Sequence, residues 1–298
     1  MKIEVFEPSG FCSGVKRALH QLETIKLENQ DKQIILLGNL IHNEYTINKL
    51  KEQGITILLR YFDNFEMRIK KFDKNKVIFV FSAHGHDPKY EEILKKYDFT
   101  FFDTTCPIVQ KNKSILKNYL DRKYHIIFVG KHHHPETAGM MALSKDIYVC
   151  DPEYKNHTYK FTLNKNYRYV VVPQTTISLD DFLEVSSYVH TINRRIEIRR
   201  DMLCGLVKSR EEGTKRLKND YNCILVVGSK YSSNTTALFN TAKFYNPDKK
   251  VLYIYGIEDI KKDLFTEKDK IIIFTGTSTP EEEIKIIIKK ISSFFQSK

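Results

Sequence analysis

Residues 10–18 read Gly-Phe-Cys-Ser-Gly-Val-Lys-Arg-Ala, and this stretch indicates how the whole chain is organised. It follows an alternating apolar pattern at residues 2–6, places a cysteine between two glycines and opens a helical pattern. Alone, such a loop fits a reactive cysteine or a glycine-rich phosphate turn. Similar loops recur at Cys106, 94 residues after Cys12, and at Cys204, another 98 residues on. The three cysteines therefore divide the chain into near-equal thirds.

Other residues repeat at the same intervals. A glycine ends the next expected strand 24 to 26 residues after each cysteine, at Gly38, Gly130 and Gly228. A polar side chain comes four residues beyond each glycine, and a second polar turn follows 69 to 74 residues after each cysteine. These positions are His42, His134, Ser232, His84, Thr175 and Ser278. Such self-similarity at a fixed period predicts a repeated structural unit.

Strand-like apolar runs alternate with amphipathic helical patterns along the whole chain, which predicts an α/β protein with mainly parallel strands. We expect three similar α/β domains in a pseudo-threefold trefoil, at residues 1–97, 98–194 and 195–298. The expected strands are 2–6, 33–37, 77–81, 99–102, 124–129, 147–150, 168–172, 195–199, 222–227, 251–255 and 270–274. The expected helices are 14–29, 44–53, 88–97, 107–122, 135–144, 178–193, 206–219, 233–244 and 280–295.

The cysteines and the six repeated polar positions all follow expected strands. Loops after the carboxyl ends of parallel strands line the ligand crevice of such sheets. A pseudo-threefold arrangement would therefore direct Cys12, Cys106 and Cys204, with six polar loops, at one central cavity.

Three converging cysteines favour a metal centre, because thiolates are soft ligands for zinc, copper(I) and iron–sulfur clusters. Structural zinc sites usually use closely spaced cysteine pairs, whereas these cysteines are single. A [4Fe–4S] cluster normally takes four cysteines. We therefore expect a [4Fe–4S] cluster with one iron lacking a protein ligand and open to a substrate oxygen. A three-cysteine zinc site is the second alternative, and three unliganded loop cysteines are the third.

Composition limits the other classes of function. No apolar run approaches the ~20 residues needed to cross a bilayer, so we expect no membrane partner. The first residues form a strand pattern and not a signal segment, which favours a cytoplasmic protein or the mature form of an organelle protein. The net charge of +11 raises the possibility of nucleic-acid binding. Since the lysines are spread over almost every helical pattern, we expect no nucleic-acid partner.

The five cysteines are an odd number, which argues against a disulfide framework. Cys150 and Cys223 lie in apolar strand patterns, so we expect them to be buried in the core.

The remaining loop residues fit a polar pocket with an anion site. Glu136 follows Pro135 at an expected helix start, where a carboxylate could cap the helix or donate a proton. Hydroxyl and amide side chains at residues 174–178, 229–234 and 276–280 could each be N-caps. Several helix N-termini that face one cavity would bind an anion, either phosphate or a substrate carboxylate.

These loops resemble those of the LytB family, the 4-hydroxy-3-methylbut-2-enyl diphosphate reductases. The matching motifs run in the family's order from residue 10 to residue 280. They are Gly-Phe-Cys-Ser-Gly-Val at 10–15, His-Asn at 42–43, Ser-Ala-His-Gly at 82–85, Asp-Thr-Thr-Cys-Pro at 103–107, His-Pro-Glu at 134–136, Gln-Thr-Thr at 174–176, Gly-Ser-Lys at 228–230, Ser-Ser-Asn at 232–234 and Gly-x-Ser-x-Pro at 276–280. The resemblance implies a trefoil of three α/β domains around a [4Fe–4S] cluster.

The resemblance also implies roles for individual residues. Cys12, Cys106 and Cys204 would hold the cluster. The diphosphate would be bound by His42, His84, Ser232, Ser233, Asn234 and Ser278. His134, Glu136 and Thr175 would surround the hydroxymethyl group of the substrate, with Thr175 orienting the hydroxyl and Glu136 relaying protons.

The implied reaction is reductive dehydroxylation of 4-hydroxy-3-methylbut-2-enyl diphosphate to isopentenyl diphosphate and dimethylallyl diphosphate, the last step of the non-mevalonate isoprenoid pathway. Ferredoxin or flavodoxin would donate the electrons.

The chain departs from the family pattern around its third cysteine. The family usually reads Asp-Thr-x-Cys followed by a run ending Thr-x-x-Arg, whereas residues 201–210 read Asp-Met-Leu-Cys-Gly-Leu-Val-Lys-Ser-Arg. Val207 lacks the hydroxyl expected beside the cluster, and Arg210 keeps its place. The alternative function is therefore a catalytically degenerate family member that acts as a metal- or nucleic-acid-binding protein.

Overall fold

The computed structural model describes residues 1–60, 62–154, 163–164, 166–217 and 220–295. These residues form three four-stranded sheets in which all neighbouring strands are parallel. This finding confirms the predicted α/β class. The chain divides into two compact units. The first unit is Met1–Val15, His42–Lys49 and Cys204–Lys298, and the second is Lys16–Ile41 and Leu50–Leu203.

The first unit contains one sheet with helices on both faces. The strands lie in the order β1 (Lys2–Val5), β12 (Lys270–Thr275), β10 (Cys223–Val227) and β11 (Lys250–Ile254). The helices are α9 (Gly205–Lys215), α10 (Ser233–Tyr245) and α11 (Glu281–Ser293), with short 3₁₀ turns η3 (Ile257–Asp259) and η4 (Lys262–Leu264).

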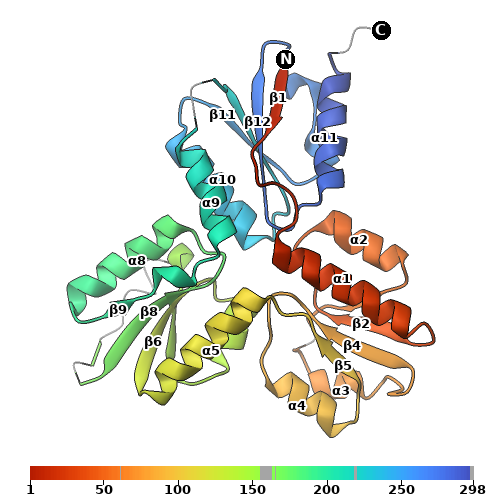
Figure 1. Cartoon of the computed structure of the whole chain (residues 1–298), viewed down its shortest axis with the longest axis vertical. Coiled ribbons are helices and arrows are strands. Elements are labelled where there is room, and N and C mark those ends of the chain that lie inside the picture. Colours follow the sequence, from red (N-terminus) through yellow and green to blue (C-terminus); the bar gives the residue numbers. More distant parts are fainter. Residues whose placement is uncertain (61, 155–162, 165, 218–219, 296–298) are drawn as a thin grey trace. The chain divides into compact units, whose positions relative to one another are not determined.

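The two faces of this sheet bury different helices, because successive residues of a strand point to opposite sides. Leu225 and Ile273 pack with Ile287 of α11. Their strand neighbours Val226 and Phe274 pack with α10 on the other face. Figure 1 shows α11 and α10 on opposite sides of the sheet. Cover on both faces explains why the central strands are continuous apolar runs instead of alternating ones.

The second unit contains two sheets. The first has the order β3 (Thr56–Leu58), β2 (Gln33–Leu37), β4 (Val77–Phe81) and β5 (Phe101–Asp103). The second has the order β7 (Ile147–Cys150), β6 (Tyr124–Val129), β8 (Arg168–Pro173) and β9 (Glu197–Ile198). Among the described residues, the other helices are α1 (Ser13–Glu28), α2 (Glu44–Glu52), α3 (Phe65–Ile69), α4 (Lys89–Lys96), α5 (Pro107–Asp121), α6 (Pro135–Met141) and α8 (Leu179–Ile192), with 3₁₀ turns η1 (Pro152–Tyr154) and η2 (Arg200–Met202).

The sheet around β6 repeats the two-faced packing of the first unit. Phe128 packs with Leu116 of α5, and Ile127 packs with Phe182 of α8. Figure 1 shows α5 and α8 on opposite sides of β6 and β8. Met140 of α6 packs in the same hydrophobic cluster as Phe128 and Leu116, so α6 lies on the α5 side of the sheet.

All three sheets have the same strand order, and this order reflects the repeat in the sequence. In each sheet, one edge strand comes from the start of the next third: β5 pairs with β4, and β9 pairs with β8. The chain's first strand, β1, takes the equivalent edge beside β12 (Figure 1). Each cysteine of interest therefore lies between the edge strand of one sheet and the first helix of a third. The three-domain division at residues 97 and 194 stays a prediction.

Among the α-helices and strands of the described residues, two were not predicted, and several ends differ. The missed elements are β3 and α3, which are only three and five residues long and carry little periodic signal. The helix expected at 206–219 ends at Lys215, and residues 218–219 lie outside the described residues. The strands expected at 99–102 and 195–199 are shorter, at Phe101–Asp103 and Glu197–Ile198. None of the helices in the described ranges is both long and apolar enough to span a bilayer.

Candidate functional site

The three repeated cysteines each stand directly before a helix. Cys12 precedes Ser13, the first residue of α1, and Cys106 and Cys204 are the N-cap residues of α5 and α9. All three are thiols outside any disulfide bond, and all three are partly exposed. Their sulfur atoms thus lie at helix N-termini, where the helix dipole favours negative charge.

The other two cysteines differ from these three in burial and in their place in the fold. Cys150 and Cys223 are buried in strands, as predicted. Burial raises the pKa of each thiol to about 12, so both remain neutral thiols near pH 7. Since metals bind the thiolate and not the thiol, Cys150 and Cys223 are poor candidates for ligands.

In the first unit, the Cys12 loop is held by backbone contacts with the segment after β12. The Cys12 N–H donates to the Thr277 carbonyl at 3.0 Å, and the Gly10 N–H donates to Thr275 Oγ1 at 3.2 Å. Gly10 has φ +70°, a conformation that favours glycine, and a Cβ there would lie 2.9 Å from Cγ of Glu281. Both the turn and the close packing against Glu281 therefore require glycine at position 10.

Arg210 fixes the same loop from α9. The side chain is 1% exposed, and its guanidinium donates to the carbonyl oxygens of Pro8, Thr275 and Gly10 at 2.8 to 2.9 Å. Burial lowers the pKa of Arg210, and the negative charges of Cys12, Glu7 and Cys204 oppose this effect. The guanidinium stays charged near neutral pH because arginine does not deprotonate in proteins. Arg210 thus places a buried positive charge where it acts on two of the three cysteines.

The start of α10 carries unsatisfied hydrogen-bond donors. Ser232 is the N-cap, and its Oγ accepts from the Thr235 N–H at 3.2 Å. Asn234 Oδ1 accepts from the Thr277 N–H at 2.8 Å. In the part of the chain that the structure describes, Ser233 Oγ and Asn234 Nδ2 are buried without a hydrogen-bond partner. Buried orphan donors at a helix N-terminus form an arrangement that suits a phosphate group.

The segment around His42 packs on the loop at Ser278. Ser278 Oγ donates to the His42 carbonyl at 2.8 Å, and Asn43 Nδ2 donates to Glu283 Oε2 at 2.9 Å. Burial lowers the pKa of His42, and Glu44 partly offsets this effect. The structure therefore brings His42, Ser278 and the first turn of α10 into one region of the first unit.

The second unit holds a buried carboxyl group. Glu136 lies in the first turn of α6, is 2% exposed and accepts two hydrogen bonds from Thr175. The Thr175 backbone N–H donates to Oε1 at 2.8 Å, and its hydroxyl donates to Oε2 at 2.6 Å. Burial raises the pKa of Glu136 to about 7, although both bonds from Thr175 act to lower it. A carboxyl group with this pKa can both hold and release a proton at neutral pH.

Two histidines lie beside this carboxyl group. His134 is the N-cap of α6, and its Nδ1 accepts from the Glu136 backbone N–H at 3.2 Å. The rings of His84 and His134 meet edge to face, with centroids 5.5 Å apart. Cys106 is tied to the His84 loop because its N–H donates to the Ala83 carbonyl at 2.9 Å. The structure thus brings together four predicted residues of the second unit: His84, His134, Glu136 and Thr175.

Some residues near these loops received no clear role from the sequence. Val207, singled out for its missing hydroxyl, is buried in α9. His132 and His133 are exposed, unlike the predicted His134. Arg210 was noted only for its place in the motif, because a sequence does not reveal which carbonyl oxygens a guanidinium will reach. His86 was missed, and its position two residues after His84 in a loop was the only signal.

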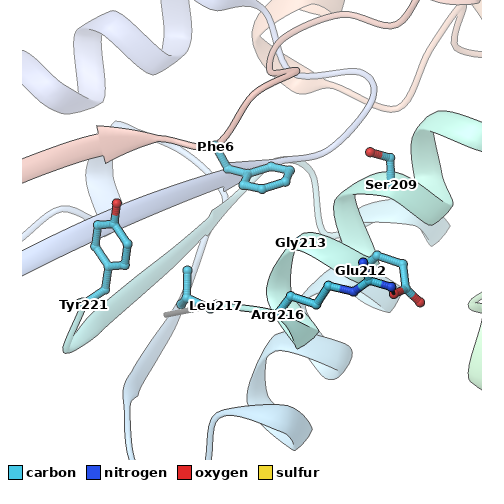
Figure 2. A pocket seen from close by; sticks show the side chains of 7 residues that line it. All are labelled: Phe6, Ser209, Glu212, Gly213, Arg216, Leu217 and Tyr221. Carbon is cyan, nitrogen blue, oxygen red and sulfur yellow. Dashed lines mark ion pairs between the residues drawn. The ribbon is translucent and has the colours of Figure 1, made fainter. Parts of the chain in front are cut away.

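A hollow of about 400 Å³ lies elsewhere in the first unit. Figure 2 shows Ser209, Gly213 and Arg216 along α9 on one side of it, with Phe6 and Tyr221 opposite. None of the predicted site residues lines this hollow. Volume alone therefore does not identify the site, whose predicted residues lie in the loops described above.

A sequence model described as "LytB protein" matches residues 3–292. The chain belongs to the LytB family. Among curated proteins, a 4-hydroxy-3-methylbut-2-enyl diphosphate reductase of Dictyoglomus thermophilum is 31% identical over 99% of this chain and 98% of its own length. The enzyme of the same name from Pseudothermotoga lettingae is also 31% identical, over 98% of both chains.

Solved structures agree with this membership in the LytB family. A structure of (E)-4-hydroxy-3-methyl-but-2-enyl diphosphate reductase, the terminal enzyme of the non-mevalonate pathway, is 26% identical. It has a TM-score of 0.65 and covers 98% of this chain and 100% of its own. The E-1-hydroxy-2-methyl-but-2-enyl-4-diphosphate reductase of Plasmodium falciparum has a TM-score of 0.85 at 24% identity, and covers 97% of this chain and 87% of its own. The second likeness concerns the fold alone.

Proposed function

We propose that this chain is an iron–sulfur oxidoreductase that converts 4-hydroxy-3-methylbut-2-enyl diphosphate to isopentenyl diphosphate and dimethylallyl diphosphate. Membership in the LytB family supports the reaction class. The observation that carries the proposal for this chain's own residues is Glu136, whose buried carboxyl group has a pKa of about 7. A dehydroxylation that consumes protons needs such a group near the breaking C–O bond.

The proposed cofactor is a [4Fe–4S] cluster held by Cys12, Cys106 and Cys204, with one iron lacking a protein ligand. These three residues suit the cluster as ligands, because their thiols form no disulfide bond, are partly exposed and stand at helix N-termini. Bound there, the cluster would supply single electrons and a Lewis-acidic iron. That residues of both units serve one cluster is part of the proposal.

The proposed diphosphate ligands are His42, His84, Ser232, Ser233, Asn234 and Ser278. The unpartnered Ser233 Oγ and Asn234 Nδ2 support the assignment, since a phosphate oxygen would satisfy both donors. The positive end of α10 adds favourable charge. A phosphate explains these orphan donors better than a carboxylate, because it offers more acceptor oxygens.

At the reacting end of the substrate, the proposed roles belong to Thr175, Glu136 and His134. Thr175 orients the hydroxyl group, and Glu136 supplies a proton. His134 Nδ1 already accepts the backbone N–H of Glu136, so it holds the start of α6 and the carboxyl group in place. The overall reaction consumes two electrons and two protons, releases water and leaves the diphosphate unchanged.

Ferredoxin or flavodoxin is the proposed electron donor, and the cytoplasm is the proposed location. Both are inferred from the resemblance to the LytB reductases.

The cluster is tested by anaerobic reconstitution with iron and sulfide, followed by absorption spectroscopy and iron analysis. We expect the native chain to become brown and to bind close to four irons. Cys12→Ala, Cys106→Ala and Cys204→Ala should each lose most of this iron. Cys150→Ala is the matched control and should keep it, because Cys150 is a buried neutral thiol. A colourless native protein after reconstitution would refute the cluster.

The reaction is tested with the diphosphate substrate and reduced viologen as electron donor, with both products measured. Turnover comparable to that of other family members would exclude the degenerate alternative. A loaded cluster without turnover, together with salt-sensitive RNA binding, would support that alternative instead.

A further inference from the structure

A small cavity lies beside Glu136, entirely within the second unit. Its volume is about 30 Å³, and its lining includes His84, His86, Asp103, Lys113 and Glu136. This volume accommodates roughly one or two water molecules. The polar lining provides the hydrogen-bond partners that a buried water needs. Glu136 is thus connected to a polar pocket on the side of α5 and the loop at residue 86.

His86 is a buried imidazole in this lining that the proposed reaction does not use. The residue is 4% exposed, and its ring stacks on Phe81 with centroids 3.6 Å apart. Nε2 lies 2.9 Å from Oε1 of Glu91, a partly exposed residue of α4. Nδ1 lies 4.0 Å from Asp103 Oδ1 and, among the described residues, has no hydrogen-bond partner. An unpartnered nitrogen of this kind requires a water or another proton donor beside it.

The packing fixes Glu136 and His86 relative to each other. α6, which carries Glu136 in its first turn, lies with Gly139 directly against the His86 backbone. A Cβ at Gly139 would lie 2.9 Å from the His86 carbonyl oxygen, so only glycine fits this approach. The two groups therefore face the same cavity as parts of one rigid contact.

We propose that His86 returns protons from solvent to Glu136 through water in this cavity. The inference rests on the proposed function, in which Glu136 gives its proton to the reacting substrate. His86 does not touch substrate in this scheme and acts only through Glu136. The route matters because Glu136 is buried and, with substrate bound, needs a path to solvent that does not cross the substrate site.

Each transfer involves only N–H and O–H bonds. The imidazolium form of His86 passes its Nδ1 proton to the cavity water, and that water passes one of its own protons to the Glu136 carboxylate. The ring is then neutral, with its Nε2–H still donated to Glu91. It regains a proton at Nδ1 from solvent through the partly exposed Asp103. The net result is one proton moved from solvent to Glu136.

The charged groups around the His86 ring are compatible with this proton transfer. Burial lowers the pKa of His86, whereas Glu91 and Asp103 raise it and Lys113 of α5 lowers it slightly. The imidazolium is therefore a short-lived form that two carboxylates stabilise. Loss of the Glu136 proton adds a negative charge beside that of Asp103 in the cavity lining and favours protonation of His86.

Infrared spectroscopy of the unloaded protein tests the route without any turnover. The C=O stretch of protonated Glu136 is identified by its loss in Glu136→Gln, and its shift after transfer to D₂O reports proton exchange. We expect exchange in His86→Gln to slow at least tenfold relative to the native chain. His125→Gln is the matched control, since His125 is a half-buried histidine that does not line the cavity. Unchanged exchange in His86→Gln would overturn the proposal.

Glu91→Gln and Asp103→Asn separate the two possible entry points, and both residues are partly exposed, so folding is less at risk than in the core. Slower exchange in Asp103→Asn supports entry through Asp103. Exchange slowed only in Glu91→Gln would overturn the stated direction of transfer at Nδ1.

The steady-state reductase assay gives an independent readout. His86→Gln should lower kcat about tenfold, at the low end of what proton-transfer groups contribute, and leave KM nearly unchanged. The solvent isotope effect on kcat should increase, because proton return becomes rate-limiting. Absence of reductase activity in the native chain would refute the proposed function, whereas the infrared result on exchange would still stand.

Discussion

Arg210 in the first unit and Glu136 in the second are both buried ionisable groups, but burial has different consequences for their charge at neutral pH. Arg210 is 1% exposed and donates to three backbone carbonyl oxygens. Glu136 is 2% exposed and accepts from a single residue, Thr175. Burial moves the pKa of both groups toward neutrality. The arginine starts so far above pH 7 that it stays charged, whereas the carboxyl group arrives at about 7.

The same physical effect therefore produces a fixed charge in one unit and a movable proton in the other. Arg210 holds the Cys12 loop through three backbone carbonyl oxygens and interacts electrostatically with Cys12 and Cys204. Glu136, with a pKa of about 7, changes its protonation state near neutral pH. We infer that the first unit supplies rigid positioning and anion binding, and that the second supplies proton chemistry.

Glu136→Gln should have the largest effect and is the most direct way to break this comparison. Gln keeps the shape and can accept from Thr175, but it carries no transferable proton. Turnover should fall by roughly 10²- to 10⁴-fold. Iron content after reconstitution should equal that of the native chain, which distinguishes a proton role from a structural one. A variant with near-native turnover would remove Glu136 from the chemistry.

Arg210→Met should have the next largest effect, on stability and on the cluster together. The carbonyl oxygens of Pro8, Gly10 and Thr275 lose their donors inside the protein. The free energy of unfolding of the unloaded chain should fall by about 3 kcal/mol or more in a urea titration. Iron uptake should fall as well, because the Cys12 loop loses its support.

Arg216→Met on the same helix is the matched control for Arg210. Its side chain is exposed and pairs with Glu212, so the variant should lose less than about 0.5 kcal/mol. Equal stability of the Arg210→Met and native chains would mean that the buried guanidinium does not fix the loop.

The pH dependence of the free energy of unfolding tests the same difference between Glu136 and Arg210. Glu136 has a higher pKa in the folded chain than its usual 4.5, so the folded state holds more protons between about pH 4.5 and 7. Stability contributed by this group is present below pH 4.5 and is lost as the pH rises through 7. Native protein and Glu136→Gln should unfold alike near pH 5. At pH 8 the variant should be more stable, by on the order of 3 kcal/mol.

A flat difference between pH 5 and pH 8 in urea titrations would contradict the raised pKa. The difference in stability between Arg210→Met and the native chain should instead stay constant from pH 5 to pH 8, because the guanidinium does not titrate in this range.

Sequence patterns predicted the repeat, the α/β class and the placement of the site loops after strands. This succeeded because periodicity and motif spacing are local properties of the chain. They did not predict that the strand before each cysteine pairs with the sheet of another third. Nor did they predict the bonds of Arg210, which join residues about 200 positions apart at Pro8 and Gly10. Contacts of this kind depend on tertiary packing, and a single sequence carries no direct record of them.

The candidate residues themselves divide in the same way. Residue type and position singled out Glu136 and Thr175, but only the folded chain shows the two hydrogen bonds between them. His86 had no distinguishing pattern, since its importance comes from a cavity formed by several elements.

Of the free-energy changes predicted for Glu136, Arg210 and Thr175, that of Thr175→Val should be the smallest, and it tests how the hydroxyl group contributes to the pKa of Glu136. The hydroxyl that donates to Glu136 Oε2 favours the ionised form, so its removal should raise the pKa above about 7. A hydrogen bond to a charged group contributes on the order of 1.5 kcal/mol, which corresponds to about one pH unit. The infrared titration midpoint of Glu136 should move to higher pH by this amount. Since the protonated carboxyl group is the active form, residual turnover should also persist to higher pH. Thr175→Ser keeps the hydroxyl and should titrate like the native chain. A midpoint that moves to lower pH in Thr175→Val would show that the hydroxyl stabilises the protonated form, and that it raises the pKa of Glu136 together with burial.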